Sequence, residues 1–382
     1  MRPRVALAFG LAFAACSTPD HEAPQDLAVS LDLAIGPRGP NDHPPEPLLV
    51  SHGGPVLKAM ELWTVVWAGE EDLGAQLDQF HAWMFGSDAW KALAQYGVGP
   101  GKAMGVIDIT DTPAPATVDD IAFQLYTNKL TAQPKYAANA NTVFAFVLPV
   151  GTVLTVGGYP GSCTEFRGYH YETNAGLPYI ALPQCQDNDG LSAFDILTTV
   201  ATHEAGETAT DPRPFVAPAW VNADYGSYGE VGDLCTALNV KLPAPGRAPD
   251  DAGVGGYFVQ RLYSNEAARL GNVDPCVPAP AGVAYFGVAV DPFNIDVSTL
   301  GPHLAHLEPF AFGGAGALSW SLPDWTTPLH FDPSEGSAMP GETIPLTITV
   351  TAPLNSGSYV FPLRATNANG DQNLWFFSLD VR

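Results

Sequence analysis

The residues best suited to chemistry lie in one short run, His203-Glu-Ala-Gly-Glu207. On a helix, His203 and Glu207 would leave the same face one turn apart. Zinc peptidases of the His-Glu-x-x-His type place two metal ligands in this way and use the intervening glutamate as a general base. Here a carboxylate, also an acceptable zinc ligand, replaces the second histidine. The run therefore predicts a metal site with Glu204 as the base. The simpler alternative is that these residues form a solvated polar helix face.

The third ligand must come from another part of the chain. Glu230 and Asp233 lie in the downstream segment 229–235, and we favour Glu230. Asp233 is kept either as a ligand or as a hydrogen-bond partner of His203. His170 is a further alternative, although a structural role between two tyrosines is the simpler interpretation. Zinc is the first expectation for the ion, and calcium or manganese are the alternatives because the site is rich in oxygen.

The motif needs a helix and a sheet to position it. A helical stretch begins near Ser192 and leads directly into His203. Before it, apolar periodicity predicts strands at 59–67, 104–109, 142–150 and 177–182, and helices at 72–96 and 118–129. This order is typical of an α/β (α+β) fold, so we expect a zincin-like, metalloprotease-type domain over residues 48–280.

The pattern changes in the last hundred residues or so of the chain. Short apolar runs alternate with Pro, Gly and Asn turns about every ten residues, which is typical of an all-β sandwich. The predicted strands are 282–290, 318–322, 344–351, 357–365 and 374–381. We therefore expect an immunoglobulin-like sandwich over residues 281–382.

The amino terminus predicts export. A short basic start is followed by an apolar run that ends in Ala14-Ala15-Cys16, which resembles a bacterial lipoprotein cleavage site. We expect residues 1–16 to hold the signal, with Cys16 lipidated and 17–47 forming a disordered linker. The alternative is an ordinary secretory signal. Either way the protein is extracytoplasmic, anchored to a membrane or secreted, and the Cys16 anchor is its only expected contact with a lipid bilayer.

Charge and cysteine content narrow the class of protein further. The formal net charge of −24 opposes phosphate backbones, so nucleic-acid binding is not expected. Apart from Cys16, four cysteines remain, and in an oxidising compartment they form two disulfides. Three pairings are possible, and the shortest loops favour Cys163 with Cys185 and Cys235 with Cys276.

The motif and the segments around it resemble the phosphate-induced protein 1, or exordium-like, family of exported and cell-wall proteins. That family has a His-Glu-x-x-Glu helix, then Asn-Pro or Asp-Pro, a tryptophan, and Glu-Ile-Gly-Asp-Leu-Cys. The matching residues are His203, Glu204, Glu207, Asp211, Pro212, Trp220 and Glu230 to Cys235, with Val231 in place of Ile. The order of the motifs agrees over roughly residues 50–276. The resemblance implies an envelope-related or growth-related role and strengthens the expected metal site, but it names no substrate.

Two functions from different classes follow. The first is a zincin-like metallohydrolase, a peptidase acting on peptide or protein. The second is a non-catalytic envelope protein with a structural ion, whose sandwich binds protein or a cell-envelope glycan. A weaker suggestion of carbohydrate binding comes from Trp320, Trp325 and Trp375, for which core packing is the simpler interpretation.

Overall fold

The computed structural model describes residues 38–382 except 111, 187–189, 225–228, 248–254, 315 and 324–327. This part of the chain is mostly β-sheet with few helices. One sheet has five strands in the order β3-β2-β5-β9-β8. Their bounds are β2 Glu61–Trp67, β3 Lys102–Ile109, β5 Thr142–Leu148, β8 Tyr169–Glu172 and β9 Pro178–Pro183. Four of the strands run parallel, and β8 pairs antiparallel with β9 at one edge.

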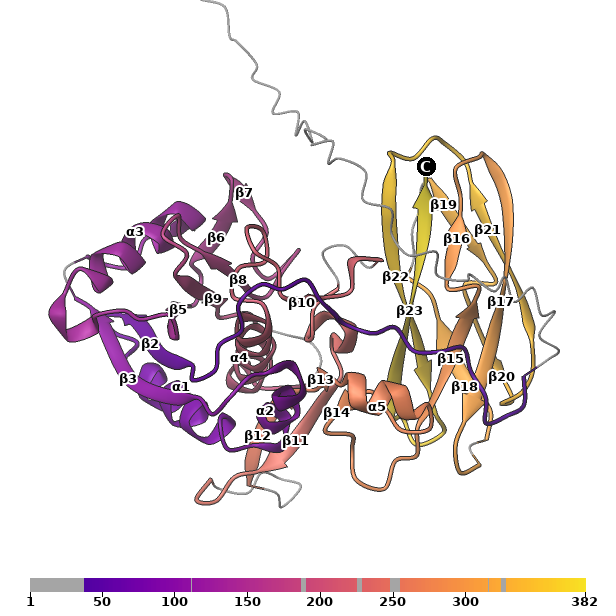
Figure 1. Ribbon diagram of the computed structural model, residues 1–382, viewed down its shortest axis with the longest axis horizontal. Coiled ribbons are helices and arrows are strands. Elements are labelled where there is room, and N and C mark those ends of the chain that lie inside the picture. The colour runs from indigo at the N-terminus through magenta and orange to yellow at the C-terminus, as the bar shows by residue number, and fades with distance from the viewer. Residues whose placement is uncertain are drawn as a thin grey trace, which may run out of the picture. The chain divides into compact units, whose positions relative to one another are not determined.

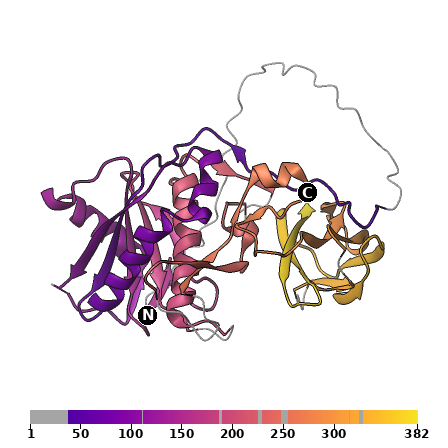
Figure 2. The same ribbon diagram turned by 90° about the horizontal axis from the view of Figure 1, so that it is seen from below.

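Helices cover both faces of this sheet. On one face, α1 (Glu71–Met84) and α4 (Ala193–Thr210) pack against strand residues such as Val66 and Ile180. On the other face, Phe123 of α3 (Asp120–Thr131) packs against Phe144 and Phe146. Figure 1 and Figure 2 show the helices on either side of the strands. A parallel sheet covered on both faces requires continuously apolar strands, and every residue of β5 is accordingly buried.

The helix predicted at 72–96 is wrong in its length. Helix α1 ends at Met84, and the chain begins a separate helix, α2 (Asp88–Lys91), after Gly86. Ser87 has an extended backbone there, and its hydroxyl accepts a hydrogen bond from the Trp90 N–H at 3.3 Å. A serine in this position caps the start of a new helix and thereby ends the old one.

Helix α4 is buried on most of its surface, which is unusual for a helix that carries several polar residues. Ser192 caps its first turn by accepting a hydrogen bond from the Asp195 N–H. Its threonine hydroxyls donate to carbonyls three or four residues earlier in the same helix, at Thr198, Thr199, Thr202, Thr208 and Thr210. Because these hydroxyls are satisfied within the helix, they can be buried without leaving a donor unpaired.

Smaller elements complete the first part of the chain. They are β1 Val50–Ser51, the 3-10 helix η1 Ala92–Tyr96, β4 Thr117–Asp119, η2 Pro134–Tyr136, β6 Val153–Val156, β7 Tyr159–Pro160, β10 Trp220–Val221, η4 Asp233–Cys235, β11 Asn239–Pro243, β12 Gly256–Gln260, β13 Leu262–Tyr263, α5 Asn265–Leu270 and β14 Cys276–Val277. Both predicted disulfides are confirmed, Cys163 with Cys185 and Cys235 with Cys276. The second disulfide joins η4 to β14.

Two sheets make up the carboxy-terminal part of the chain. Their strand orders are β15-β17-β21-β19 and β16-β23-β22-β18-β20. The bounds are β15 Phe286–Asp291, β16 Asn294–Asp296, β17 Gly301–Ala311, β18 Leu318–Ser321, β19 Leu329–Asp332, β20 Glu335–Ala338, β21 Ile344–Val350, β22 Gly357–Thr366 and β23 Gln372–Val381. One apolar core draws on both sheets, which gives a β-sandwich. The strands predicted here are confirmed, and β16, β17, β19 and β20 are additional. Trp320 and Trp375 are buried in this core, and Trp325 lies outside the described residues.

The linker expected at 17–47 is wrong in its extent. Its last ten residues, 38–47, make defined contacts. Arg38 forms ion pairs with Asp291 at 2.9 Å and Glu308 at 2.6 Å, and the His43 ring packs against Phe310. The signal at 1–16, the Cys16 anchor and the rest of the linker lie outside the described residues. Among the residues that are described, no helix has the length and apolar character needed to cross a membrane.

Candidate metal centre

Four elements bring the predicted site residues together. Helix α4 presents His203, Glu204 and Glu207 from its carboxyl-terminal half. Edge strand β8 contributes His170, and η4 contributes Asp233 at its first position. Glu230 precedes η4 by three residues. The residues therefore meet where the carboxyl-terminal half of α4 passes the edge of the five-stranded sheet.

The first group of potential ligands is His203, Glu207 and Asp233. Nε2 of His203 lies 3.1 Å from Oε1 of Glu207 and 3.7 Å from Oδ1 of Asp233. The backbone N–H of Asp233 donates to the same Oε1 of Glu207 at 3.1 Å, which fixes η4 against the helix. One ligand atom from each of the three residues lies within 4.8 Å of the other two. The group has a spacing that a metal ion can bridge.

The second group is His170, Glu204 and Glu207, in which one ligand atom from each residue again lies within 4.8 Å of the other two. Nδ1 of His170 lies 3.4 Å from Oε2 of Glu207 and 3.6 Å from Oε2 of Glu204. All three residues are buried. The two groups share Glu207, whose two carboxylate oxygens face different histidines.

The far side of each imidazole is also held. Nδ1 of His203 lies 2.8 Å from Nε2 of Gln260, which also donates to the Gly232 carbonyl at 2.8 Å. Nε2 of His170 lies 3.2 Å from the Asp211 carbonyl oxygen and 3.5 Å from Oε1 of Glu230. Histidines that bind metals donate a hydrogen bond from the nitrogen that does not face the ion, and His170 faces acceptor oxygens there, whereas Nδ1 of His203 accepts from the Gln260 amide. Each ring therefore directs its other nitrogen toward Glu207.

Glycines allow the chain to approach the site closely. A Cβ atom at position 232 would lie 2.7 Å from Nδ1 of His203 and 2.8 Å from Oε1 of Glu207. A Cβ at position 168 would lie 2.9 Å from Oε1 of Glu204. All three distances are shorter than the usual van der Waals separation between a carbon atom and a nitrogen or oxygen atom. Gly232 and Gly168 therefore leave the room that the site side chains occupy.

Burial and mutual repulsion set the protonation of the cluster. Burial, together with the charge of Glu207, raises the pKa of Asp233 to about 8, and burial raises the pKa of Glu230 well above its usual range. Although burial opposes the charged imidazolium, the surrounding carboxylates raise the pKa of both His170 and His203 above the usual value. The cluster therefore holds protons that a bound cation would displace.

These donors fit a divalent metal ion. Nitrogen from imidazole suits zinc, whereas manganese and calcium favour the oxygen ligands that the carboxylates supply. Oε1 of Glu230 and Oδ2 of Asp211 are buried without a hydrogen-bond partner in the described structure. Buried carboxylate oxygens of this kind are stabilised by a nearby positive charge.

Most of the predicted site residues fall into two adjacent groups. His203 and Glu207 lie together with Asp233, whereas Glu230 lies beside His170 and is not in the His203 group. Asp211 is fully buried, and its Oδ1 accepts from the Ala219 N–H, which agrees with a role in the turn after α4.

Gln260 and Gly232 were not recognised in the sequence. Gln260 belongs to β12, and it reaches His203 only because β12 packs along α4. Gly232 lies inside the recognised Gly-Glu-Val-Gly-Asp segment, so its position offered a signal that sequence reasoning did not use.

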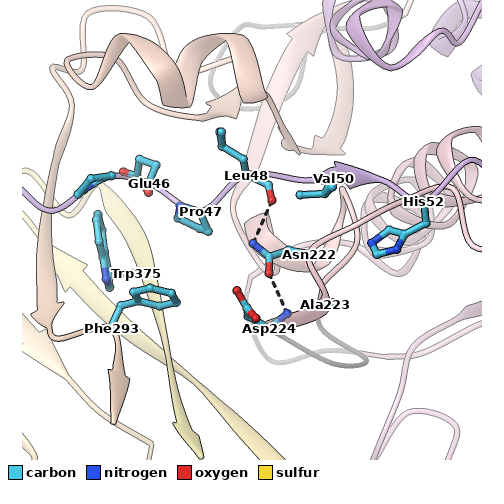
Figure 3. A pocket seen from close by; sticks show the side chains of 11 residues that line it. Glu46, Pro47, Leu48, Val50, His52, Asn222, Ala223, Asp224, Phe293 and Trp375 are labelled. Carbon is cyan, nitrogen blue, oxygen red and sulfur yellow. Dashed lines mark hydrogen bonds between the residues drawn. The ribbon is translucent and has the colours of Figure 1, made fainter. Parts of the chain in front are cut away.

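A separate pocket of about 480 Å³ contains none of these residues. Leu48, Val50, His52, Asn222, Phe293 and Trp375 are among its lining residues (Figure 3). The Asn222 side chain donates to the Leu48 carbonyl at 3.0 Å and accepts from the Asp224 N–H at 3.0 Å. The polar groups of Asn222 are thus already bonded within the chain.

Comparisons with known proteins do not identify the chain. No family model and no curated protein matches it. Among solved structures, a nucleoside hydrolase-related protein from Saccharophagus degradans has a TM-score of 0.26 at 11% identity, covering 85% of this chain and 100% of its own. WR4, an MSP family member from C. elegans, has a TM-score of 0.22 at 12% identity, covering 25% of this chain and 97% of its own. CopC from Methylosinus trichosporium OB3b has a TM-score of 0.15 at 22% identity, covering 25% of this chain and 93% of its own. Similarity at this level supports no functional argument.

Proposed function

We propose that the protein is a zincin-like, metal-dependent hydrolase that acts on peptide or protein substrates outside the cytoplasm. The observation that carries the proposal is the convergence of His203, Glu207 and Asp233 on one point, with Glu204 beside them. Zinc is the proposed ion, with manganese or calcium as alternatives. When bound, such an ion polarises a water molecule and a substrate carbonyl.

Residues of the chain would serve as metal ligands, orient those ligands and accept a proton. His203, Glu207 and Asp233 bind the ion, and Gln260 orients the His203 ring. Oε1 of Glu204 lies 4.0 Å from Nε2 of His203, so it can accept the proton of a water molecule held at this group. The side chains of His203 and Asp233 are 16% and 15% exposed, so substrate would enter from their side.

The edge of the sheet favours a peptide substrate over other classes. Strand β8 carries His170, and among the described residues it pairs with β9 alone. An extended peptide can add to an open strand edge through main-chain hydrogen bonds. A peptide bound along β8 would pass the centre to which His170 contributes.

The test measures both metal and turnover. Elemental analysis of the purified protein should find bound zinc, and His203→Ala should remove the ion held by the His203 group. Glu204→Gln should keep that ion and lower peptide hydrolysis by about 10²–10⁴-fold, since a general base contributes about this much. Glu266→Gln, an exposed change on α5, is the matched control and should hydrolyse normally. Metal content unchanged in His203→Ala would contradict the proposal.

A non-catalytic role is the second candidate, and one observation favours it. Glu204 and Glu207 are 4% and 3% exposed, which also suits an ion that stabilises the fold. In that case, removal of the metal lowers the melting temperature, and Glu204→Gln changes neither stability nor function. The sandwich would then be the binding module, for a protein or a cell-envelope glycan.

The two disulfides are consistent with an extracytoplasmic location. We further propose that Cys16 anchors the protein to a membrane as a lipoprotein, and that residues from about 50 to 276 belong to the exordium-like family. Mass spectrometry of the membrane-extracted protein would detect the acylated Cys16, and an unmodified amino terminus in a soluble fraction would contradict the anchor.

A further inference from the structure

Glu207 occupies an unusual position between the two histidines. Its Oε1 lies 3.1 Å from Nε2 of His203, and its Oε2 lies 3.4 Å from Nδ1 of His170. Glu204 repeats the arrangement at longer range, with Oε1 4.0 Å from His203 and Oε2 3.6 Å from His170. A carboxylate with one oxygen on each side is the geometry by which two metal ions share a ligand.

The environment of His170 supplies a second, independent observation. Oε1 of Glu230 lies 3.5 Å from Nε2 of His170, and this oxygen is buried without a hydrogen-bond partner in the described structure. Oδ2 of Asp211, a fully buried residue, is likewise without one. An imidazole whose far nitrogen faces a carboxylate and a carbonyl is held as metal-binding histidines are held.

Charge argues in the same direction. Five carboxyl groups gather at the centre, those of Glu204, Glu207, Asp211, Glu230 and Asp233. A single divalent ion in the His203 group offsets two negative charges and lies on one side of Glu207. The carboxylates nearest His170 would then have only the His170 ring as a counter-charge, and a second cation would supply the charge that several buried carboxylates require.

We propose that the centre binds two divalent cations, the second held by Nδ1 of His170 and the carboxylates of Glu204 and Glu207, with Glu207 bridging the two ions. The inference deepens the proposed function and rests on the first ion of that function. Glu230 and the Asp211 carbonyl act as positioning groups for His170. With the second ion bound, Glu204 would serve as one of its ligands, and with the second position empty, Glu204 would be available as the base.

Metal stoichiometry tests the inference on the full chain. The protein is loaded with Mn²⁺, freed of excess ion by gel filtration, and analysed for manganese per folded chain. The wild type should hold about two ions, and His170→Ala and His203→Ala about one each, since each loses one histidine ligand. His306→Ala, an exposed histidine of the sandwich, is the matched control and should hold two.

Electron paramagnetic resonance of the loaded wild type gives a measurement that needs no variant to fold. Two Mn²⁺ ions that share a carboxylate lie about 3.5–4 Å apart and interact magnetically, which alters the isolated six-line spectrum. One ion per chain, lost in His203→Ala and kept in His170→Ala, would overturn the second position and leave the proposed function standing. No bound Mn²⁺ would overturn the second position, and no bound zinc in the elemental analysis would overturn the proposed function. Two ions with the spectrum of isolated Mn²⁺ would overturn the bridge through Glu207.

Discussion

Replacing Gly232 with alanine should weaken metal binding without disturbing the local backbone. Gly232 has φ −84° and ψ −40°, which alanine adopts readily, so the effect of the change is purely steric. The new Cβ would lie 2.7 Å from Nδ1 of His203 and 2.8 Å from Oε1 of Glu207. To reach a favourable separation of about 3.5 Å, the His203 ring must retreat by about 0.8 Å and the Glu207 carboxylate by about 0.7 Å.

The magnitude follows from how strictly metal sites fix their ligands. Ligand distances vary by only about 0.2 Å, so a shift of about 0.8 Å displaces a donor from the ion. Disturbing the support of a ligand typically costs about 10–100-fold in affinity, equivalent to about 1.4–2.8 kcal/mol. We expect a loss of that size for the ion held by His203, Glu207 and Asp233.

Competition against a chromogenic chelator measures the affinity directly. Gly86→Ala is the matched control, because its new Cβ meets only Trp83 O at an ordinary 3.5 Å. Circular dichroism establishes that both variants are folded. A folded Gly232→Ala protein that binds zinc within about twofold of the wild type would refute the reasoning, because the ion could not then lie where His203 and Glu207 converge.

Three further predictions concern stability. With metal removed by a chelator, the protein should become less stable as pH rises toward about 8, because Asp233 and both site histidines have raised pKa values and bind protons more tightly in the folded state than in the unfolded state. Thermal melts at several pH values measure this trend, and added metal should flatten it. A rise in melting temperature across the same pH range would contradict the prediction. Replacing Cys235 and Cys276 together by serine opens a loop with a sequence separation of 41 residues. The change should lower the free energy of unfolding, measured by urea titration, by about 4 kcal/mol. An unchanged unfolding midpoint would show that the loop is already ordered without the bond. Arg261→Met should lower the free energy of unfolding by about 3–5 kcal/mol, because Arg261 is 2% exposed and its loss removes the ion-pair partner of Asp274. A loss under about 1 kcal/mol would mean that water reaches Asp274.

The sequence was most informative where the signal was local. The continuous apolar run of β5, the Ser192 cap of α4 and the alternating residues of β21 each predict their element from a few neighbouring residues. The disulfide pairing also followed from short loops. These features depend on near neighbours in the chain, and the structure confirms them.

Strand β17 shows where local patterning fails. It runs from Gly301 to Ala311 but contains two prolines and two histidines, so it lacks clear apolar alternation. Its prolines are tolerated because Pro302 lies near the start of the strand and Pro309 lies beyond Leu307, the last residue that pairs with β21. Pairing with neighbours on both sides, rather than its own composition, makes this segment a strand.

The site shows the same limit. His203 and Glu207 were found because helical spacing relates them. His170 and Gln260 reach them from β8 and β12, and no spacing along the chain encodes that approach. The sequence analysis favoured Glu230 over Asp233 as the third ligand, whereas the structure places Asp233 beside His203 and Glu230 beside His170.

The threonine-rich composition of α4 has a consequence for the order of folding. Threonine and glycine are poor helix formers, and this helix holds five back-bonded threonines and Gly206 in addition to its site residues. In isolation the segment would be largely unstructured, because its helicity depends on burial against the sheet. His203 and Glu207 therefore come into register only after the sheet has formed. A cation bound by these residues would therefore be captured late, by a nearly complete fold.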